Sequence, residues 1–306
     1  MIGHLRVKSP WSQLAIFLGL LGASFIIASL MMVGMAAMNG LPLTGLDQMD
    51  WSDSRIVATM KWIQALSSLV IFLLPSFVFA LIVFNGRPFY FLGFRRAGRP
   101  NLYLLASLCM LLAFPLVFWL GEINQLIPLP EWMNAFEKDA TKQMEAFLKA
   151  DGFADVLINI IVIALLPAIC EEIAFRGVLQ RIFIAVFRNP WGGIIFAAFL
   201  FSAFHLQFQG FLPRMFLGVL LGVMYWYSGS LWTSILAHFV YNGVQVGVVS
   251  YAPKYVSQNP SVPFFAALIS AAAVGVIVWI FRKRSTVTYA AEYETDELNK
   301  HNQFIA

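Results

Sequence analysis

The stretch PAICEEIAFRGVLQR, residues 167–181, places two glutamates and an arginine inside an apolar run of the chain. An ionisable side chain at the centre of a membrane span costs about 2.5–3.5 kcal/mol on insertion scales, and such residues usually serve a function. Glu172 and Arg176 stand four positions apart, so on a helix they share a face and can form an ion pair. Glu171 is rotated by about 100° from Glu172. We therefore expect Glu171 to point away from the pair, toward the histidines of later apolar runs.

Two of the four histidines lie in later apolar runs, FLFSAFHLQF and ILAHFVYNGV. Phe201 and His205 are spaced i and i+4, as are His238 and Asn242, so each pair is expected on one helical face. A carboxylate assisted by a histidine can act as a general base on water. His238 and Asn242 offer two donors for a developing oxyanion. The set predicts water-mediated amide hydrolysis inside the membrane.

Each of these residues also has a purely structural explanation. A buried Glu–Arg pair can stabilise a helix bundle, and an intramembrane histidine can be a hydrogen-bond partner between helices. Asn242 alone says nothing about activity. The three motifs together, in order and on successive apolar runs, favour the catalytic interpretation.

The elements that must position these residues are transmembrane helices. The 306 residues are 60% hydrophobic and 12% charged, with a mean hydropathy of +0.76, whereas soluble domains carry about 25% charged residues. A hydrocarbon core about 30 Å thick needs about 20 apolar residues per helix. About eight such runs are present: 12–38, 62–84, 102–121, 154–180, 191–209, 212–228, 231–250 and 263–281. We expect an all-α, polytopic membrane helix bundle.

Lysine and arginine predict its orientation. With the N-terminus inside, eleven basic residues fall on the inner side (Arg6, Lys8, Arg87, Arg95, Arg96, Arg99, Arg181, Arg188, Arg282, Lys283 and Arg284) and seven on the outer side (Arg55, Lys61, Lys138, Lys142, Lys149, Arg214 and Lys254). The positive-inside rule then places both termini in the cytoplasm. The glutamates fall in the inner half of the run 154–180, so we expect a site reached from the cytoplasm.

The chain divides into three parts. Residues 1–150 are expected to hold the N-terminal spans and an amphipathic helix near 131–149 on the outer surface, residues 151–284 the catalytic core, and residues 285–306 a polar, disordered cytoplasmic tail. The first apolar run is longer than the ~7–15 residues of a signal peptide, so we expect a retained span. Cys109 and Cys170 are expected to be inert packing residues. The net charge of +4 comes from loop residues and implies no nucleic-acid partner.

The motifs Glu171-Glu172-x-x-x-Arg176, Phe201-x-x-x-His205 and His238-x-x-x-Asn242 resemble those of the CPBP family, which comprises the type II CAAX prenyl endopeptidases and the bacteriocin-processing or Abi-type membrane proteins. The resemblance covers residues 150–250. It implies about eight transmembrane helices enclosing a polar cavity, in a multi-pass protein of the bacterial inner (plasma) membrane. It also implies an endopeptidase whose substrate is a membrane-anchored protein or peptide, C-terminal and prenylated in the eukaryotic relatives.

The same resemblance implies a role for each motif residue. Glu171 would activate water with help from His205, Glu172 and Arg176 would balance charge, and His238 and Asn242 would bind the oxyanion. This mechanism needs no cofactor.

Three alternatives stay open at this stage. Glu171, His205 and His238 could hold zinc in a metalloprotease, although the chain has no His-Glu-x-x-His motif. A non-catalytic scaffold or a bacteriocin-immunity-type protein could keep the motifs for stability. A transporter could use Glu171 and His205 as a proton relay, but no repeated halves support it.

Overall fold

The computed structural model describes residues 9–42, 49–83, 87–256, 258 and 260–286, and in these ranges it contains helices and no strands. The predicted all-α class is confirmed. The α-helices are α1 (Pro10–Met38), α2 (Ser54–Ser68), α3 (Leu74–Val83), α4 (Pro88–Phe91), α5 (Asn101–Leu112), α6 (Phe114–Gln125), α7 (Glu131–Leu148), α8 (Phe153–Asn159), α9 (Leu166–Glu172), α10 (Arg181–Phe187), α11 (Pro190–Ala203), α12 (Phe211–Ser228), α13 (Leu231–Tyr251) and α14 (Phe264–Arg284). Three π-helical stretches, η3 (Leu69–Leu73), η4 (Ile160–Leu165) and η5 (Ile173–Gln180), and two 3₁₀ turns, η6 (Phe208–Gly210) and η7 (Pro253–Val256), complete the set.

The chain is an integral membrane protein. Within the described ranges, five helices are long and apolar enough to cross a membrane: Pro10–Met38, Ser54–Val83, Phe153–Phe187, Phe208–Ser228 and Phe264–Arg284. The α5–α6 pair, bent by 42° just before Pro115, makes a sixth when it is counted as one span. The remaining two predicted runs correspond to α13 and to the shorter apolar helix α11.

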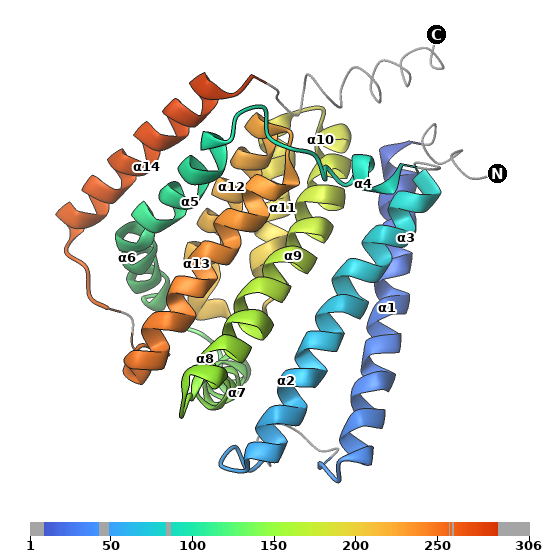
Figure 1. Ribbon diagram of the computed structural model, residues 1–306, viewed down its shortest axis with the longest axis vertical. Helices are drawn as coiled ribbons and strands as arrows, with labels where there is room; N and C mark the ends of the chain where they lie inside the picture. The colour runs from blue at the N-terminus through green and yellow to red at the C-terminus, as the bar shows by residue number, and fades with distance from the viewer. Residues whose placement is uncertain (1–8, 43–48, 84–86, 257, 259, 287–306) are drawn as a thin grey trace.

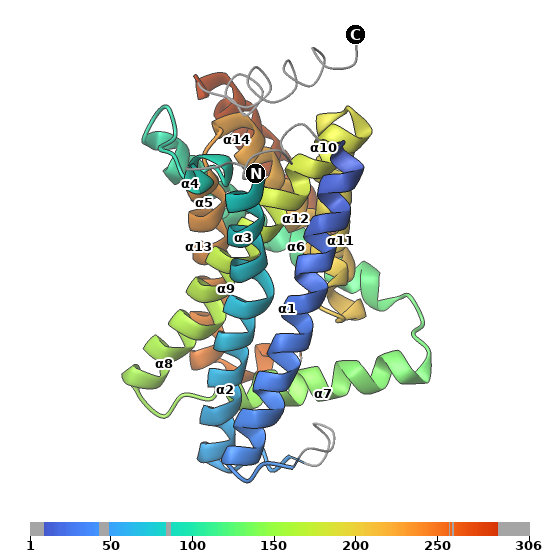
Figure 2. The same cartoon turned by 90° about the vertical axis from the view of Figure 1, so that its right-hand side faces the viewer.

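The helices form a bundle whose two ends differ (Figure 1). We call the end with α4, α10 and the last turn of α14 the termini end, because α1 starts there and α14 finishes there. The opposite end, with α7 and α8, is the α7 end. Figure 2 shows α7 running across that end, roughly at right angles to the long helices.

Long-range packing brings the second half of the chain together. Helix α13 packs against α5 and η4, α11 packs against α12 and α10, and α14 packs against α5 and α6. Helix α11 begins sharply because the Asn189 side chain accepts hydrogen bonds from the amides of Trp191 and Gly192, with Pro190 in the first turn. Cys109 and Cys170 are both buried and unbonded, in line with a packing role.

Helix α7 matches the amphipathic helix predicted near residues 131–149. Phe147 is fully buried against Trp51, and the backbone amide of Gln209 donates to Oε1 of Glu137 at 3.1 Å. The helix therefore caps one end of the bundle. The predicted tail, residues 285–306, lies outside the described residues from position 287 onward.

Candidate intramembrane active site

Glu172 accepts hydrogen bonds from two cationic or ionisable groups in the core of the bundle. Its Oε1 atom lies 2.6 Å from Nη1 of Arg176 and 3.0 Å from Nδ1 of His238. The Glu172 side chain is 0% exposed and that of Arg176 is 1% exposed. Burying a charge at this depth requires a paired partner and good hydrogen-bond geometry. The predicted ion pair between Glu172 and Arg176 is confirmed, and His238 joins it.

The Arg176 guanidinium is held from three helices. Besides Glu172, its Nη2 atom donates to the carbonyl oxygen of Gly218 on α12 at 2.9 Å. Its central carbon lies 4.6 Å from the centre of the Phe201 ring on α11. The ion pair crosses the junction between α9 and the π-helical stretch η5, a form of backbone that is frequent at functional sites.

A second polar contact of the same kind lies about one helical turn further along the chain. Gln180 stands four residues after Arg176, and its Nε2 atom donates to the carbonyl oxygen of Gly222 at 3.2 Å. A Cβ atom at Gly222 would lie 2.6 Å from Oε1 of Gln180 and 2.9 Å from Cγ2 of Ile194. A larger residue at this position would therefore displace the Gln180 amide and crowd Ile194.

Sequence reasoning missed Gln180, Gly218 and Gly222. The signal was present, because glycines four residues apart are a common device for close packing of membrane helices. Gln180 is also a polar residue four positions after Arg176 in an apolar stretch.

A cavity of about 480 Å³ lies among α6, α7, α9, α12 and α13, a size typical of ligand pockets. Glu171, His205, His238 and Asn242 all contribute to its lining, whereas Glu172 does not. The side chain of Glu171 is half-buried. The structure therefore separates the two adjacent glutamates: one lies within the packed core and the other borders a cavity.

His205 lies in the turn that follows α11, not inside a helix. Helix α11 ends at Ala203, and Leu206 adopts a left-handed φ of 53°. The expectation that the helix continues to residue 209 is wrong. With 14 residues and a rise of about 1.5 Å per residue, α11 is shorter than the hydrocarbon core. The turn therefore brings His205 into the bundle interior, beside the cavity.

Hydrogen bonds define the tautomers of the two histidines. Nδ1 of His205 lies 2.8 Å from the carbonyl oxygen of Phe201, and Nδ1 of His238 contacts the Glu172 carboxylate. Both partners are acceptors, so each Nδ1 atom carries the hydrogen. In the neutral ring, Nε2 is then a hydrogen-bond acceptor. The Phe201 ring contacts both imidazoles, at centroid distances of 5.1 Å to His205 and 5.8 Å to His238.

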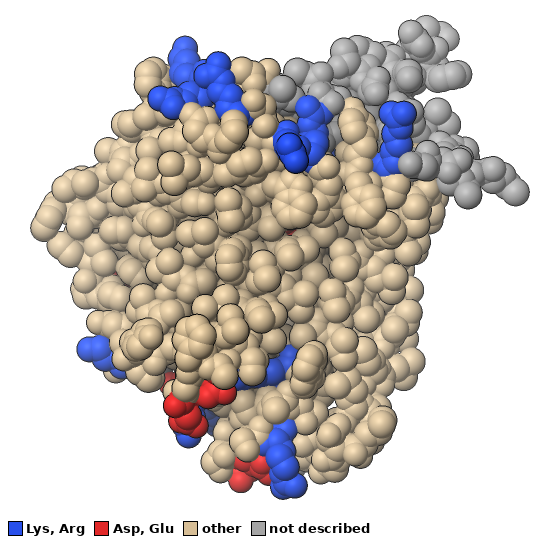
Figure 3. Space-filling model, viewed as in Figure 1, with Lys and Arg blue, Asp and Glu red and all other residues tan. Residues whose placement is uncertain are grey.

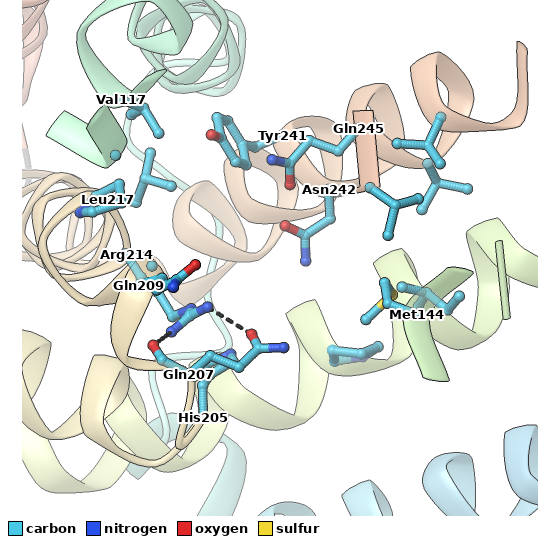
Figure 4. Close-up of a pocket in the computed structure, with 18 of the residues that line it drawn as sticks. Val117, Met144, His205, Gln207, Gln209, Arg214, Leu217, Tyr241, Asn242 and Gln245 are labelled. Atoms are coloured by element: carbon cyan, nitrogen blue, oxygen red, sulfur yellow. Dashed lines mark hydrogen bonds between the residues drawn. The ribbon is translucent and has the colours of Figure 1, made fainter. Parts of the chain in front are cut away.

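Arg214 also lines the cavity, although the sequence analysis counted it only among the basic residues of the outer side. It lies in the first turn of α12, and its Nη1 and Nη2 atoms donate to the backbone oxygen and to Oε1 of Gln207, at 3.2 and 2.8 Å (Figure 4). Arg214 is also within Coulombic range of Glu171 and Glu137.

The cavity wall is rich in side-chain amides. Six line it: Gln64, Gln125, Gln207, Gln209, Asn242 and Gln245. Figure 4 shows Asn242 and Gln245 on α13, across the cavity from Gln207 and Arg214. An amide side chain offers both donors and an acceptor, which matches the groups of a peptide backbone.

The site residues all lie within the part of the chain that matches a known protein family. Residues 153–244 match the family model described as type II CAAX prenyl endopeptidase Rce1-like. This segment is therefore similar to the Rce1-like family, and we call it the Rce1-like segment. It includes Glu171, Glu172, Arg176, His205, His238 and Asn242. The family is one of CAAX-type intramembrane proteases that act on membrane-associated proteins.

A curated relative covers a similar length of chain. The uncharacterized protein YpbD of Bacillus subtilis (strain 168) is 33% identical over 90 residues, which is 28% of this chain and 43% of YpbD. The matched region therefore spans less than half of that relative. No solved structure matches the chain.

The Rce1-like segment does not line the cavity alone. Gln64 from α2, Gln125 from α6 and Met144 from α7 precede the segment, and Tyr255 follows it. The N-terminal helices and α7 therefore help to shape the cavity around the motif residues.

The zinc alternative does not fit the arrangement of side chains. Glu171, His205 and His238 all line the cavity of the Rce1-like segment. Across the described part of the chain, however, no three His, Cys, Asp or Glu side chains are grouped so that they could hold one metal ion. A zinc site of this type needs three protein ligands.

The cavity faces the α7 end of the bundle. Besides motif residues, its lining includes Glu137 and Thr141 of α7, Gln209 of the α11–α12 turn, and Tyr255. The sequence predicts a site reached from the side of the termini, whereas these lining residues lie toward the opposite end of the bundle. A span that ended at residue 180 would place Glu171 in its inner half. The observed helix, Phe153–Phe187, has 35 residues, so Glu171 lies near its middle.

Proposed function

We propose that this chain is an intramembrane endopeptidase in which Glu171 activates water to hydrolyse a peptide bond of a membrane-anchored protein or peptide. The main support is that one cavity is lined by motif residues from three distant parts of the sequence: Glu171, His205, His238 and Asn242. The Rce1-like match over residues 153–244 supports a protease. The family description, a CAAX prenyl endopeptidase, names proteins with a prenylated C-terminus as substrates.

The first step is nucleophilic attack by water. A water molecule hydrogen-bonded to the Glu171 carboxylate and to Nε2 of His205 transfers a proton to Glu171 as its oxygen attacks the scissile carbonyl carbon. His205 can orient this water because its Nδ1–H is already used by the Phe201 carbonyl, which leaves the Nε2 lone pair available. Positioned general bases of this kind contribute roughly 10²–10⁴-fold to the rate.

The second step is stabilisation and collapse of the tetrahedral intermediate. The new oxyanion accepts hydrogen bonds from Nδ2 of Asn242 and, in the imidazolium form, from Nε2 of His238. The Glu172 carboxylate accepts from Nδ1 and so fixes the orientation of the His238 ring. The carbon–nitrogen bond then breaks, and the leaving amine takes the proton from Glu171. Glu172 and Arg176 act as positioning residues, since neither lines the cavity.

The proposal places the protein in the plasma membrane of a bacterium, the type of cell that contains its relative YpbD. The test compares membranes from cells that express the wild-type chain or Glu171→Gln, with protein termini identified by mass spectrometry. We expect uncleaved substrates to accumulate with Glu171→Gln. Glu122→Gln is the matched control, because Glu122 accepts from the Val262 amide and lies outside the cavity lining. An unchanged set of termini with Glu171→Gln would reject the protease and favour a scaffold.

A further inference from the structure

The two ends of the bundle carry different charge patterns. Among the described residues, the segments at the termini end carry nine basic residues (Arg87, Arg95, Arg96, Arg99, Arg181, Arg188, Arg282, Lys283 and Arg284), and positions 87–100, 181–189 and 282–286 contain no Asp or Glu. The α7 end carries seven described basic residues (Arg55, Lys61, Lys138, Lys142, Lys149, Arg214 and Lys254), and in helix α7 they alternate with Glu131, Glu137, Asp139 and Glu145. Figure 3 shows the same contrast, with only blue at the upper end and both colours at the lower end.

This asymmetry predicts which end faces the cytoplasm. Lysine and arginine in short loops near the ends of spans are retained on the cytoplasmic side, and acidic residues have little influence. The basic residues of the termini end lie in short connections, such as 87–100 between α3 and α5. The termini end therefore faces the cytoplasm, and the α7 end faces away from it.

We infer that the cavity opens on the non-cytoplasmic side of the membrane, and that its substrate is a peptide segment exposed on that side. Such a segment is an outer tail or loop of a membrane protein, or a peptide that has been exported. The substrate part of this inference rests on the proposed function. It departs from the cytoplasmic, prenylated C-terminus that the family name implies, because that C-terminus would reach the opposite end of the bundle.

The lining at the α7 end fits an incoming peptide. Tyr255 and Gln209 are exposed and border the cavity near α7, as does Gln245 on α13. The α11–α12 turn, where the chain reverses short of a full span, is tied to α7 by the hydrogen bond from Gln209 to Glu137. A peptide that enters beside α7 meets amide side chains first and the carboxylate of Glu171 deeper in the bundle.

Cysteine labelling in cells tests the side of the opening. Single substitutions Gln245→Cys in the cavity, Lys138→Cys on the exposed face of α7 and Arg96→Cys at the termini end are treated with a membrane-impermeant maleimide. Labelling is compared between spheroplasts and inverted membrane vesicles. The two native cysteines are buried, so the unmodified chain provides the blank and no cysteine-free background is needed.

We expect Gln245→Cys and Lys138→Cys to be labelled in spheroplasts, and Arg96→Cys only in inverted vesicles. The reverse pattern would overturn the inference. If the cavity is too narrow for the reagent and Gln245→Cys stays unlabelled on both sides, Lys138→Cys decides, because α7 lines the cavity. Labelling and cleavage are separate measurements. If Lys138→Cys were labelled from the cytoplasmic side while Glu171→Gln abolished cleavage, the orientation inferred here would be rejected. The proposed protease activity would still stand.

Discussion

Nδ1 of His238 on α13 lies 3.0 Å from Oε1 of Glu172 on α9. The contact joins two motifs that are 66 positions apart in the sequence. It fixes the Nδ1–H tautomer of His238 and keeps the ring at the cavity wall, where Nε2 is available to a substrate. The Glu172 carboxylate therefore has two roles, since it neutralises Arg176 and orients His238.

Removing the Glu172 carboxylate should destabilise the bundle strongly. Glu172→Leu leaves the guanidinium of Arg176 buried without its anionic partner, and breaking a buried pair in this way costs about 3–5 kcal/mol. The double variant Glu172→Leu/Arg176→Leu removes both charges and should recover much of that loss. Thermal unfolding in detergent, followed by circular dichroism, measures both. A double variant as unstable as the single one would contradict the assignment of the pair.

The two nitrogens of His238 should have separable effects. His238→Asn retains a donor near the position of Nδ1 and should keep the contact with Glu172, so we expect a melting temperature near that of the wild type. It lacks the Nε2 atom, so turnover should fall about 100-fold or more, as for loss of an oxyanion donor. His238→Ala should lose both stability and turnover. Full activity in His238→Asn would show that Nε2 has no role in the reaction.

The sequence predicted the helices well because apolar run length directly reflects bilayer thickness. The runs beginning at residues 12, 102, 154, 212 and 231 start within two residues of observed helices. It also predicted the ion pair of Glu172 with Arg176, since helical spacing alone brings those residues together.

Other parts of the site depend on tertiary contacts that no local pattern encodes. The bond from His238 to Glu172 joins helices that are distant in sequence. The early end of α11 and the left-handed turn at Leu206 moved His205 out of a helix. Arg214 was counted only as an outer basic residue, because a basic residue near the start of an apolar run normally marks the end of a span. Here its side chain lines the cavity.

Gly222→Ala should disturb the packing of α12 against η5. The new methyl group would lie 2.6 Å from Oε1 of Gln180 and 2.9 Å from Cγ2 of Ile194, and overpacking of a membrane core costs about 1–3 kcal/mol. Gly247→Ala is the matched control, because nothing lies within 4 Å of a Cβ there, and alanine favours a helix over glycine by about 1 kcal/mol. The melting temperature should fall for the first variant and stay level or rise for the second. Equal effects would contradict the contact.

Activity should survive removal of metal ions. No three potential ligands are grouped around one point in the described ranges, so the proposed reaction depends on Glu171 and His205 alone to activate water. The measurement is peptide cleavage by the purified protein after treatment with a chelator, together with metal analysis of the same sample. Loss of cleavage that zinc alone restores would replace the proposed mechanism with a metalloprotease.

Arg214→Gln should weaken catalysis without loss of the fold. Arg214 is a cavity-lining cation within Coulombic range of Glu171, and Gln207 holds its guanidinium with two hydrogen bonds. Neutralising it removes a positive charge from the cavity that also holds the general base, so kcat/KM should fall about tenfold, equivalent to about 1.4 kcal/mol. Arg214→Lys keeps the charge but not the fork held by Gln207, so its loss should be smaller and lie mainly in KM.

Lys138→Gln is the control for Arg214, because it removes a cation from the same end of the bundle at an exposed position outside the cavity lining. It should leave kcat/KM unchanged. If Arg214→Gln and Lys138→Gln reduced kcat/KM equally, the effect would come from the general charge of the α7 end. A specific role for Arg214 requires that only the cavity variant responds, while both proteins keep the wild-type melting temperature.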